Sequence, residues 1–253
     1  MVEFPKLSAK GVLVKQYDQM ASTNTAAKEM LEKGTIDQPL LISAAEQTAG
    51  HGKLSRSFYS PKGAGVYFTL GLPVSSLPSQ QIIPSRFTIT ATVAAFQVLS
   101  QMFDADISIK WVNDLYVDNV KAAGILAEAA VNNANQLCGI VVGWGLNLSQ
   151  PASLPAELKD QIGFFSRQHV DYQHRLAVID AVGTAFLGLL DQPWEDIMKV
   201  YTDHQFLAGK DLIVDNGQGK EIGRFDHITP EGYLCIKTVD GYQTFSTGTV
   251  RQW

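Results

Sequence analysis

The sequence has few cysteines, no excess of basic residues and no long apolar run. Its two cysteines, Cys138 and Cys235, lie in separate apolar runs without metal-type spacing, which predicts buried free thiols in a reducing compartment. The net charge of -5 argues against the basic surface of a nucleic-acid-binding protein. No apolar stretch approaches the ~18 residues of a membrane span, and the N-terminus shows no secretory pattern. We therefore expect a cytoplasmic protein without a membrane or nucleic-acid partner.

The 253 residues suffice for one large domain and a small one. A hydrophobic fraction of 45% supports a sizeable core. Beyond Gly209, short runs are separated by turn residues at 216–217, 230–232 and 240–241, which predicts a small all-β module. We place the domains at residues 1–207 and 208–253.

The larger domain alternates strand-like and helix-like patterns, whereas its first ten residues show no periodic pattern. Strands are predicted by the apolar runs 12–17, 39–45, 65–72, 107–111, 115–117, 120–128 and 136–142. Helices are predicted after the polar residues at 22–24, from Pro84 to Met102, over 172–190 and over 194–204.

A long loop, Glu46–Pro61, separates two of these strands. It contains two glycines, which allow close backbone approach to a ligand, and three basic or titratable groups, His51, Lys53 and Arg56. Loops of this length are usually functional or disordered. The loop is therefore either an anion-binding segment, most simply for phosphate, or a surface hairpin with solvated charges.

Three adjacent small polar residues, Ser22, Thr23 and Asn24, precede the first predicted helix. One of them is needed to cap the helix. The others are either part of an extended cap or groups that bind a polar ligand at the helix N-terminus.

Two of the predicted strands each contain a lysine, Lys110 and Lys121, whose role has two interpretations. Lys110, in the segment Lys-Trp-Val-Asn-Asp, is either solvated on an exposed face or a cation aimed at a carboxylate or phosphate. Lys121, three residues before Gly124, either protects an edge strand or lies near a ligand. The Gly-x-Gly at 143–145 either marks a bend at the end of a strand or lets the backbone face a ligand.

In order along the chain, these motifs resemble the biotin–protein ligase family. The order is Ser-Thr-Asn, the basic glycine loop, Lys-Trp-x-Asn-Asp, Lys-x-x-Gly-Ile-Leu-x-Glu and Gly-x-Gly-x-Asn, across residues 22–147. The resemblance implies an α+β fold, with a mixed β-sheet flanked by helices as in class II synthetases, and a small C-terminal SH3-like β-barrel.

The resemblance also implies a reaction in two steps. Biotin and MgATP first form biotinyl-5′-AMP, and a lysine of a carboxylase's biotin carboxyl carrier domain then attacks this adenylate. Lys110 and Arg56 are the implied catalytic residues. The implied biotin contacts are Ser22, Thr23, Asn24, Gln47, His51, Gly52, Lys53, Lys110, Gly143 and Trp144. The implied ATP contacts are Arg56, Lys121 and Asn147.

The sequence departs from the family in its loop. The family loop typically reads Gly-Arg-Gly-Arg-x-Gly-Arg, whereas here His51 and Lys53 replace arginines and Ser55 replaces a glycine. The family tryptophan after the loop is Phe58, and Val112 replaces the family proline. These changes put the strength of the loop's grip on a ligand in doubt.

Three further expectations concern the kind of protein. The few residues before the first predicted helix suggest the ligase-only form, without the DNA-binding domain of some family members. Free sheet edges suggest a weak homodimer. The alternatives are a lipoate–protein ligase, which shares the fold and chemistry, and a non-catalytic biotin or nucleotide sensor.

Overall fold

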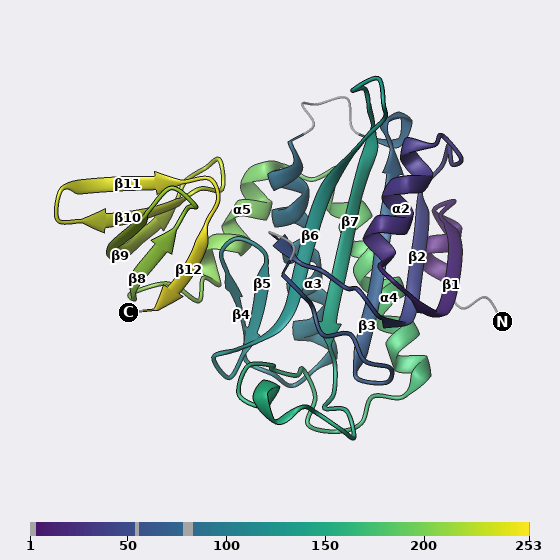
Figure 1. Cartoon of the computed structure of the whole chain (residues 1–253), viewed down its shortest axis with the longest axis horizontal. Helices are drawn as coiled ribbons and strands as arrows, with labels where there is room; N and C mark the ends of the chain where they lie inside the picture. The colour runs from purple at the N-terminus through teal and green to yellow at the C-terminus, as the bar shows by residue number, and fades with distance from the viewer. Residues whose placement is uncertain (1–3, 54–55, 78–82, 253) are drawn as a thin grey trace.

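The computed structural model describes residues 4–53, 56–77 and 83–252, which form two sheets and the helices that cover them (Figure 1). The strands are β1 (Leu13–Met20), β2 (Leu40–Gln47), β3 (Gly65–Pro73), β4 (Ile107–Lys110), β5 (Asp114–Val117), β6 (Val120–Val131), β7 (Leu137–Asn147), β8 (Asp211–Asp215), β9 (Lys220–Ile228), β10 (Leu234–Thr238), β11 (Gly241–Phe245) and β12 (Thr249–Gln252). The α-helices are α1 (Pro5–Ala9), α2 (Thr23–Glu32), α3 (Pro84–Met102), α4 (Tyr172–Leu189) and α5 (Trp194–Asp203). Short 3₁₀ turns occur at Val74–Ser76 and Ala156–Leu158. The predicted α+β class is confirmed.

The larger sheet is mixed and has the strand order β1-β2-β3-β7-β6-β5-β4. β1 pairs in parallel with β2, and the other neighbours are antiparallel. All nine residues of β3 are buried, because helices cover both faces at the centre of the sheet. β5 and β6 form a hairpin that turns at Asp118–Asn119, and both turn residues have positive φ.

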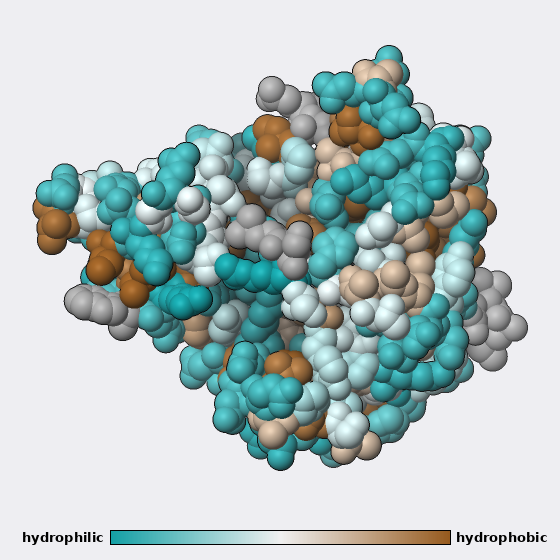
Figure 2. Space-filling model, in the orientation of Figure 1, coloured by the Kyte–Doolittle hydropathy of each residue, from teal (hydrophilic) through white to brown (hydrophobic). Residues whose placement is uncertain are grey.

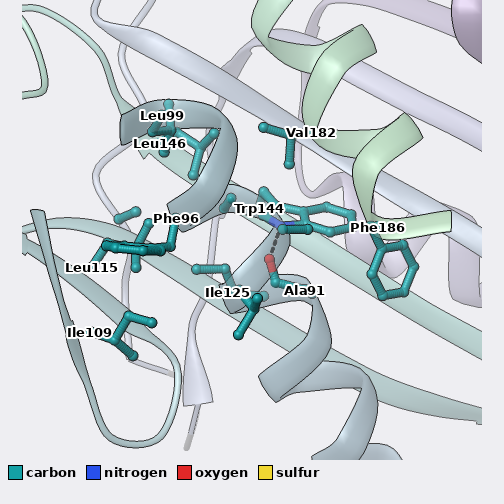
Figure 3. Packing of buried hydrophobic residues seen from close by; sticks show 14 of the residues in the cluster. Ala91, Phe96, Leu99, Ile109, Leu115, Ile125, Trp144, Leu146, Val182 and Phe186 are labelled. Carbon is teal, nitrogen blue, oxygen red and sulfur yellow. Dashed lines mark hydrogen bonds between the residues drawn. The ribbon is translucent and has the colours of Figure 1, made fainter. Parts of the chain in front are cut away.

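The helices divide the larger domain into three layers. α3 and α4 pack together on one face of the sheet, and α2 packs on the other (Figure 1). On the α3–α4 side, Trp144 stacks on Phe68 with 4.8 Å between ring centroids. Its indole also donates a hydrogen bond to the Ala91 carbonyl (Figure 3). On the α2 side, a smaller apolar cluster centres on Ala27 and Leu31. Few apolar residues therefore hold α2 on this face of the sheet, and the rest of the face is available for polar groups.

Helix α1 was not predicted by its sequence pattern. Its stabilising partner lies far away in the chain, because the buried carboxylate of Asp180 on α4 accepts hydrogen bonds from the backbone of Lys6 and Leu7. Leu7 is also fully buried. A helix of five residues has little stability of its own, so its formation depends on these tertiary contacts.

The smaller sheet, with the order β11-β10-β9-β8-β12, forms the C-terminal module. The module docks through its β9–β10 turn, whose carbonyls at Pro230 and Gly232 accept hydrogen bonds from the indoles of Trp194 and Trp111. Gly232 has φ of +86°, and a Cβ there would lie 2.4 Å from Ile89 Cδ1. The apolar core runs continuously into the module, so the proposed boundary at residue 208 separates two sheets that share one core.

Both cysteines are free, as predicted, but only Cys235 is buried, and Cys138 is half-buried. Among the residues that the structure describes, none of the helices is both long and apolar enough to cross a membrane.

Candidate active site

A cavity of about 490 Å³ opens on the α2 face of the larger sheet. It is bordered by the start of α2, the end of β2, the loop after β2, the β4–β5 turn, β6, β7 and residues 248–251 of the C-terminal module. Segments from both predicted domains thus meet at one site. Figure 2 shows that the surface around α2 and this opening is mostly hydrophilic.

The start of α2 supplies the polar wall of the cavity. Ser22 caps the helix, since its hydroxyl accepts a hydrogen bond from Thr25 N at 3.4 Å. Thr23 donates to Gln47 Oε1 from its backbone nitrogen at 2.8 Å and from its hydroxyl at 3.1 Å. One cap therefore satisfies the helix, and Thr23 is used to orient Gln47 toward the cavity.

Asn24, on α2, is held by side chains from two strands, β6 and β3. Its amide nitrogen donates to Glu128 Oε2 at 3.0 Å, and its amide oxygen lies 2.7 Å from the hydroxyl of Thr69. A Cβ at Gly143 would lie 2.0 Å from Asn24 Oδ1, so a glycine is required at that position. The buried polar groups are thus fixed before any ligand arrives.

Glycines form the floor of the cavity. Gly124 and Gly145 are cross-strand partners on β6 and β7, and the ring of Phe58 lies over both of them. A Cβ would meet the Phe58 ring at 3.3 Å from Gly124 and at 2.4 Å from Gly145. An aromatic ring can lie flat on the sheet only because these two side chains are absent.

The predicted biotin contact Trp144 lies between two glycines that line the cavity. Side chains alternate along a strand, so the indole between Gly143 and Gly145 points to the opposite face. There it is stacked on Phe68. It also meets Phe186 edge to face (Figure 3). Trp144 borders the cavity through its backbone, and its side chain belongs to the core.

The glycine loop folds back on itself in its described part. Gly52 N donates to the Arg56 carbonyl at 2.7 Å, and Phe58 N donates to the Gly50 carbonyl at 2.9 Å. The Arg56 guanidinium donates to Thr249 Oγ1 of the C-terminal module at 2.6 Å. The loop is therefore attached to the module across the cavity, while the expectations for Leu54 and Ser55 lie outside the described residues.

Two titratable groups of the loop face different surroundings. Burial lowers the pKa of Lys53, with Asp114 opposing the shift and Arg56 adding to it. His51 Nε2 lies 3.9 Å from Glu128 Oε2, and both side chains are partly exposed.

Lys110 points into the cavity and is not a solvated surface lysine. Its ammonium donates to the Tyr116 hydroxyl at 3.0 Å. Burial lowers the pKa of Lys110, with Asp114 opposing this and Lys121 adding to it. Burial also raises the pKa of Tyr116 to about 12, so the phenol is neutral and accepts the bond. A desolvated ammonium of this kind interacts strongly with an anion placed beside it.

Lys121 pairs with the carboxylate of Asp114 at 2.7 Å and lies 6.0 Å from the centroid of the Phe58 ring. Asp114 is the only carboxylate among the described residues that line the cavity. The cations among them are Lys53, Arg56, Lys110, Lys121 and Arg251. This charge balance favours an anionic ligand that carries several negative charges.

The cavity brings together all but one of the predicted site residues. The exception is Asn147, which is buried at the end of β7 and does not line the cavity. Sequence reasoning missed Asp114, Tyr116, Gln161, Thr249 and Arg251. Asp114 and Tyr116 were detectable, because they follow Lys110 by only four and six residues and a tight turn pairs Asp114 with Lys110. Residues 161 and 249–251 reach the cavity only through the tertiary fold.

These features define a class of α+β protein whose cavity, lined by several cations, suits an anionic ligand. Residues 17–147 match the biotin/lipoate A/B protein ligase family. The match covers just over half of the chain, and the chain belongs to this family.

Two curated relatives extend the match beyond this segment. The bifunctional ligase/repressor BirA of Bacillus subtilis is 27% identical over 230 residues, which are 89% of this chain and 69% of the relative. The biotin–[acetyl-CoA-carboxylase] ligase of Paracoccus denitrificans is 24% identical over 221 residues, which are 83% of this chain and 88% of the relative.

Solved structures share the fold over nearly the whole chain. The biotin protein ligase of Aquifex aeolicus, in complex with biotin and ATP, superposes with a TM-score of 0.79 at 20% sequence identity. The superposition covers 95% of this chain and 99% of the Aquifex chain. The biotin acetyl coenzyme A carboxylase synthetase of Helicobacter pylori gives a TM-score of 0.68 at 20% identity, covering 96% of this chain and 100% of its own. The predicted architecture, with a mixed sheet and a C-terminal SH3-like module, is confirmed.

Proposed function

We propose that this protein activates biotin with ATP and transfers it to a lysine of a biotin carboxyl carrier domain. The observation that carries the proposal is the placement of Lys110 among further cations, facing the fixed polar wall at the start of α2. The family covers lipoate as well as biotin, and the curated relatives named above are biotin ligases or a biotin ligase/repressor. Lipoate is therefore the less favoured substrate.

In the first step, a carboxylate oxygen of biotin attacks the α-phosphorus of ATP, and pyrophosphate leaves. Ser22, Thr23, Asn24 and Gln47 offer hydrogen bonds to the polar ring atoms of biotin, and Gly143 gives its backbone room. When the biotin carboxylate meets the α-phosphate of ATP, the Lys110 ammonium offsets their repulsion and stabilises negative charge on the phosphoryl oxygens. Lys53, Arg56 and Lys121 add positive charge for the phosphates.

In the second step, the neutral amine of the carrier lysine attacks the carbonyl carbon of the adenylate, and AMP leaves with the electron pair of the broken bond. The loop carrying Gly50, Gly52 and Arg56 excludes water from this reactive anhydride. The Arg56–Thr249 hydrogen bond holds the loop against the module and so favours the closed form. We leave Asn147 out of the proposed nucleotide contacts because it does not line the cavity.

Mg²⁺ is part of the proposal. The Asp114 carboxylate fits such an ion, because Mg²⁺ prefers oxygen ligands shared between a carboxylate and substrate phosphates. When bound, the ion would neutralise charge on the triphosphate. A cytoplasmic location and the lack of a nucleic-acid partner stay predictions.

The function is tested by incubating the protein with ATP and labelled biotin or labelled lipoate, with and without a biotin carboxyl carrier domain. We expect an adenylate from biotin alone and label on the carrier when it is added. Adenylate from lipoate would select the alternative ligase. Tight biotin binding without any adenylate would select a sensor and contradict the proposal.

We further propose a weak homodimer through β1, which is an edge strand of the larger sheet. Most of its residues are exposed, including Leu13 and Tyr17, and an exposed edge can pair with another chain.

Sedimentation at rising protein concentration, with and without biotin plus ATP, should reveal a dimer. Its loss on Tyr17→Lys, but not on Tyr242→Lys in the C-terminal module, would locate the interface. A monomer at every concentration tested would contradict it.

A further inference from the structure

A second group of metal-ligating side chains lies outside the candidate active site, in the C-terminal module. Asp226 and His227 are on β9, and Cys235 is on β10. One donor atom from each residue lies within 4.8 Å of the other two. The group has a carboxylate, an imidazole and a thiol, which is a ligand set that zinc accepts.

A β-bulge explains why three such residues meet. Neighbouring residues on a regular strand point to opposite faces, so Asp226 and His227 would normally be separated by the sheet. Here the pairing shifts, with His227 opposite Cys235 and Phe225 opposite Ile236, which leaves Asp226 as the extra residue. A bulge re-aims side chains in this way, and both β9 residues now lie beside the same β10 residue.

The surroundings of Cys235 differ from those of an ordinary core thiol. Its neighbours Leu234 and Ile236 belong to the large apolar cluster of the described residues, and Cys235 is buried outside that cluster. By strand alternation Cys235 faces the other side of the sheet, and yet it is only 4% exposed. Asp226 and His227 are among the side chains that approach it there. Cys235 is thus buried next to polar donors, and its thiol is within reach of both.

We propose that Asp226, His227 and Cys235 form a binding site for a zinc-class divalent cation on the face of the C-terminal sheet that points away from its apolar core. Zinc bonds of 2.0–2.3 Å place tetrahedral ligands about 3.3–3.8 Å apart. Donors within 4.8 Å reach this spacing by small rotations, because the Asp226 and His227 side chains are 36% and 55% exposed.

Binding of the ion replaces the thiol proton, which is released to solvent, and water completes the fourth position. The carboxylate of Asp226 already lies 2.6 Å from His227 Nδ1. It can therefore ligate the ion directly or hold the imidazole so that its other nitrogen ligates. In both arrangements the ion links β9 to β10 beside the turn that docks the module.

Two matched controls exist in the same chain. Cys138 is the other free cysteine, half-buried on β7. Asp171, which caps α4, and His174 in its first turn form a comparable pair, with 2.8 Å between His174 Nδ1 and the carboxylate. Among the described residues no third donor joins them. Cys138→Ser and His174→Gln therefore remove the same chemical groups without touching the proposed site.

The test titrates the full chain with Co²⁺ as a spectroscopic substitute for zinc and then measures Zn²⁺ affinity by competition with a chromophoric chelator. We expect one ion per chain, with the absorption of a tetrahedral thiolate–cobalt site. Cys235→Ser should abolish the thiolate band. His227→Gln should weaken zinc binding by about 10–100-fold, and Cys138→Ser and His174→Gln should leave both readouts unchanged.

Circular dichroism establishes that each variant is folded. Cys235 is buried, whereas the His227 side chain is exposed, so His227→Gln tests the site without replacing a buried side chain. Less than one ion per chain, a thiolate band that survives Cys235→Ser, or equal zinc affinity in the His227→Gln and His174→Gln proteins would overturn the proposal. None of these readouts depends on ligase activity, so the result is independent of the proposed function.

Discussion

Lys110→Ala should reduce biotinyl-adenylate formation by at least about a hundredfold while the protein remains folded. A preorganised donor aimed at developing charge contributes about 10²–10³ in rate at a desolvated site. Lys110 meets this description, because its ammonium is held by Tyr116 and lies in a cavity with a single described carboxylate. The measurement is the rate of pyrophosphate release in the presence of biotin and ATP, and thermal unfolding reports the fold.

Two control variants separate charge from position at this site. Lys110→Arg keeps the cation and should retain more activity than alanine. Lys199→Ala removes an exposed lysine of α5 and should have no effect. Adenylate formation by Lys110→Ala at the rate of the parent protein would show that Lys110 has no role in the chemical step.

The pH dependence of the same step provides a second readout. The pKa of Lys110 is lowered by burial, so the active ammonium is lost as the pH rises through this lowered value. Adenylation should therefore fall on the alkaline side at a lower pH than an ordinary lysine would cause. Tyr116→Phe removes an acceptor of the ammonium's hydrogen bond and should move this fall to still lower pH. An unchanged alkaline limb in Tyr116→Phe would contradict the role of the hydrogen bond.

Much of the fold follows from local patterns. The strands of the larger sheet and helices α2 to α5 occur where period and capping predict them, since Ser22 and Pro84 mark helix starts by local chemistry. Helix α1 does not follow from such patterns, because its backbone donors bind Asp180 about 170 residues away. Local sequence signals carry no information about such a partner.

The candidate site was predictable to a similar degree and for the same reason. The order of motifs along the chain predicts that Lys110 and the start of α2 belong to one site, but the motif alone does not say which face of the sheet the Trp144 side chain occupies. Strand alternation between Gly143 and Gly145 indicates that face. The Arg56–Thr249 contact joins residues 193 positions apart and becomes visible only in the folded chain.

The loop substitutions lead to a prediction about the retention of the adenylate. His51 and Lys53 stand where the family typically has arginines. An arginine presents a planar fork of donors, whereas a lysine is a point charge on a flexible stem. Burial lowers the pKa of Lys53, and the nearby Arg56 adds to this shift, so part of its charge is lost as the pH rises. We expect this protein to release biotinyl-AMP more readily than a variant with both arginines.

The size of the effect follows from the hydrogen bonds that are lost. Hydrogen bonds to charged groups contribute about 1.5–3 kcal/mol each, and about 1.4 kcal/mol corresponds to a tenfold change in an equilibrium constant. Restoring one such bond should slow adenylate release by about tenfold or more. His51 lies 3.9 Å from Glu128, so an arginine at this position could instead pair with that carboxylate. Lys53→Arg alone is therefore expected to account for most of the slowing of adenylate release.

Released adenylate acylates exposed lysines of other proteins, so retention can be measured as the labelling of a bystander protein. The parent, Lys53→Arg and His51→Arg/Lys53→Arg proteins are compared at equal rates of adenylate synthesis. The bystander's amines also react faster at higher pH, so their rate of reaction with added biotinyl-AMP is measured at each pH and used to correct the labelling. After this correction, labelling by the parent should rise with pH as Lys53 loses its proton. Labelling by the arginine variants should be lower and should rise less steeply, because arginine stays charged over this range. Lys199→Arg, which changes an exposed side chain of α5, is the matched control, and this variant should label the bystander as the parent does. Equal bystander labelling by the parent and the double variant at every pH would show that the loop cations do not control the release of the adenylate.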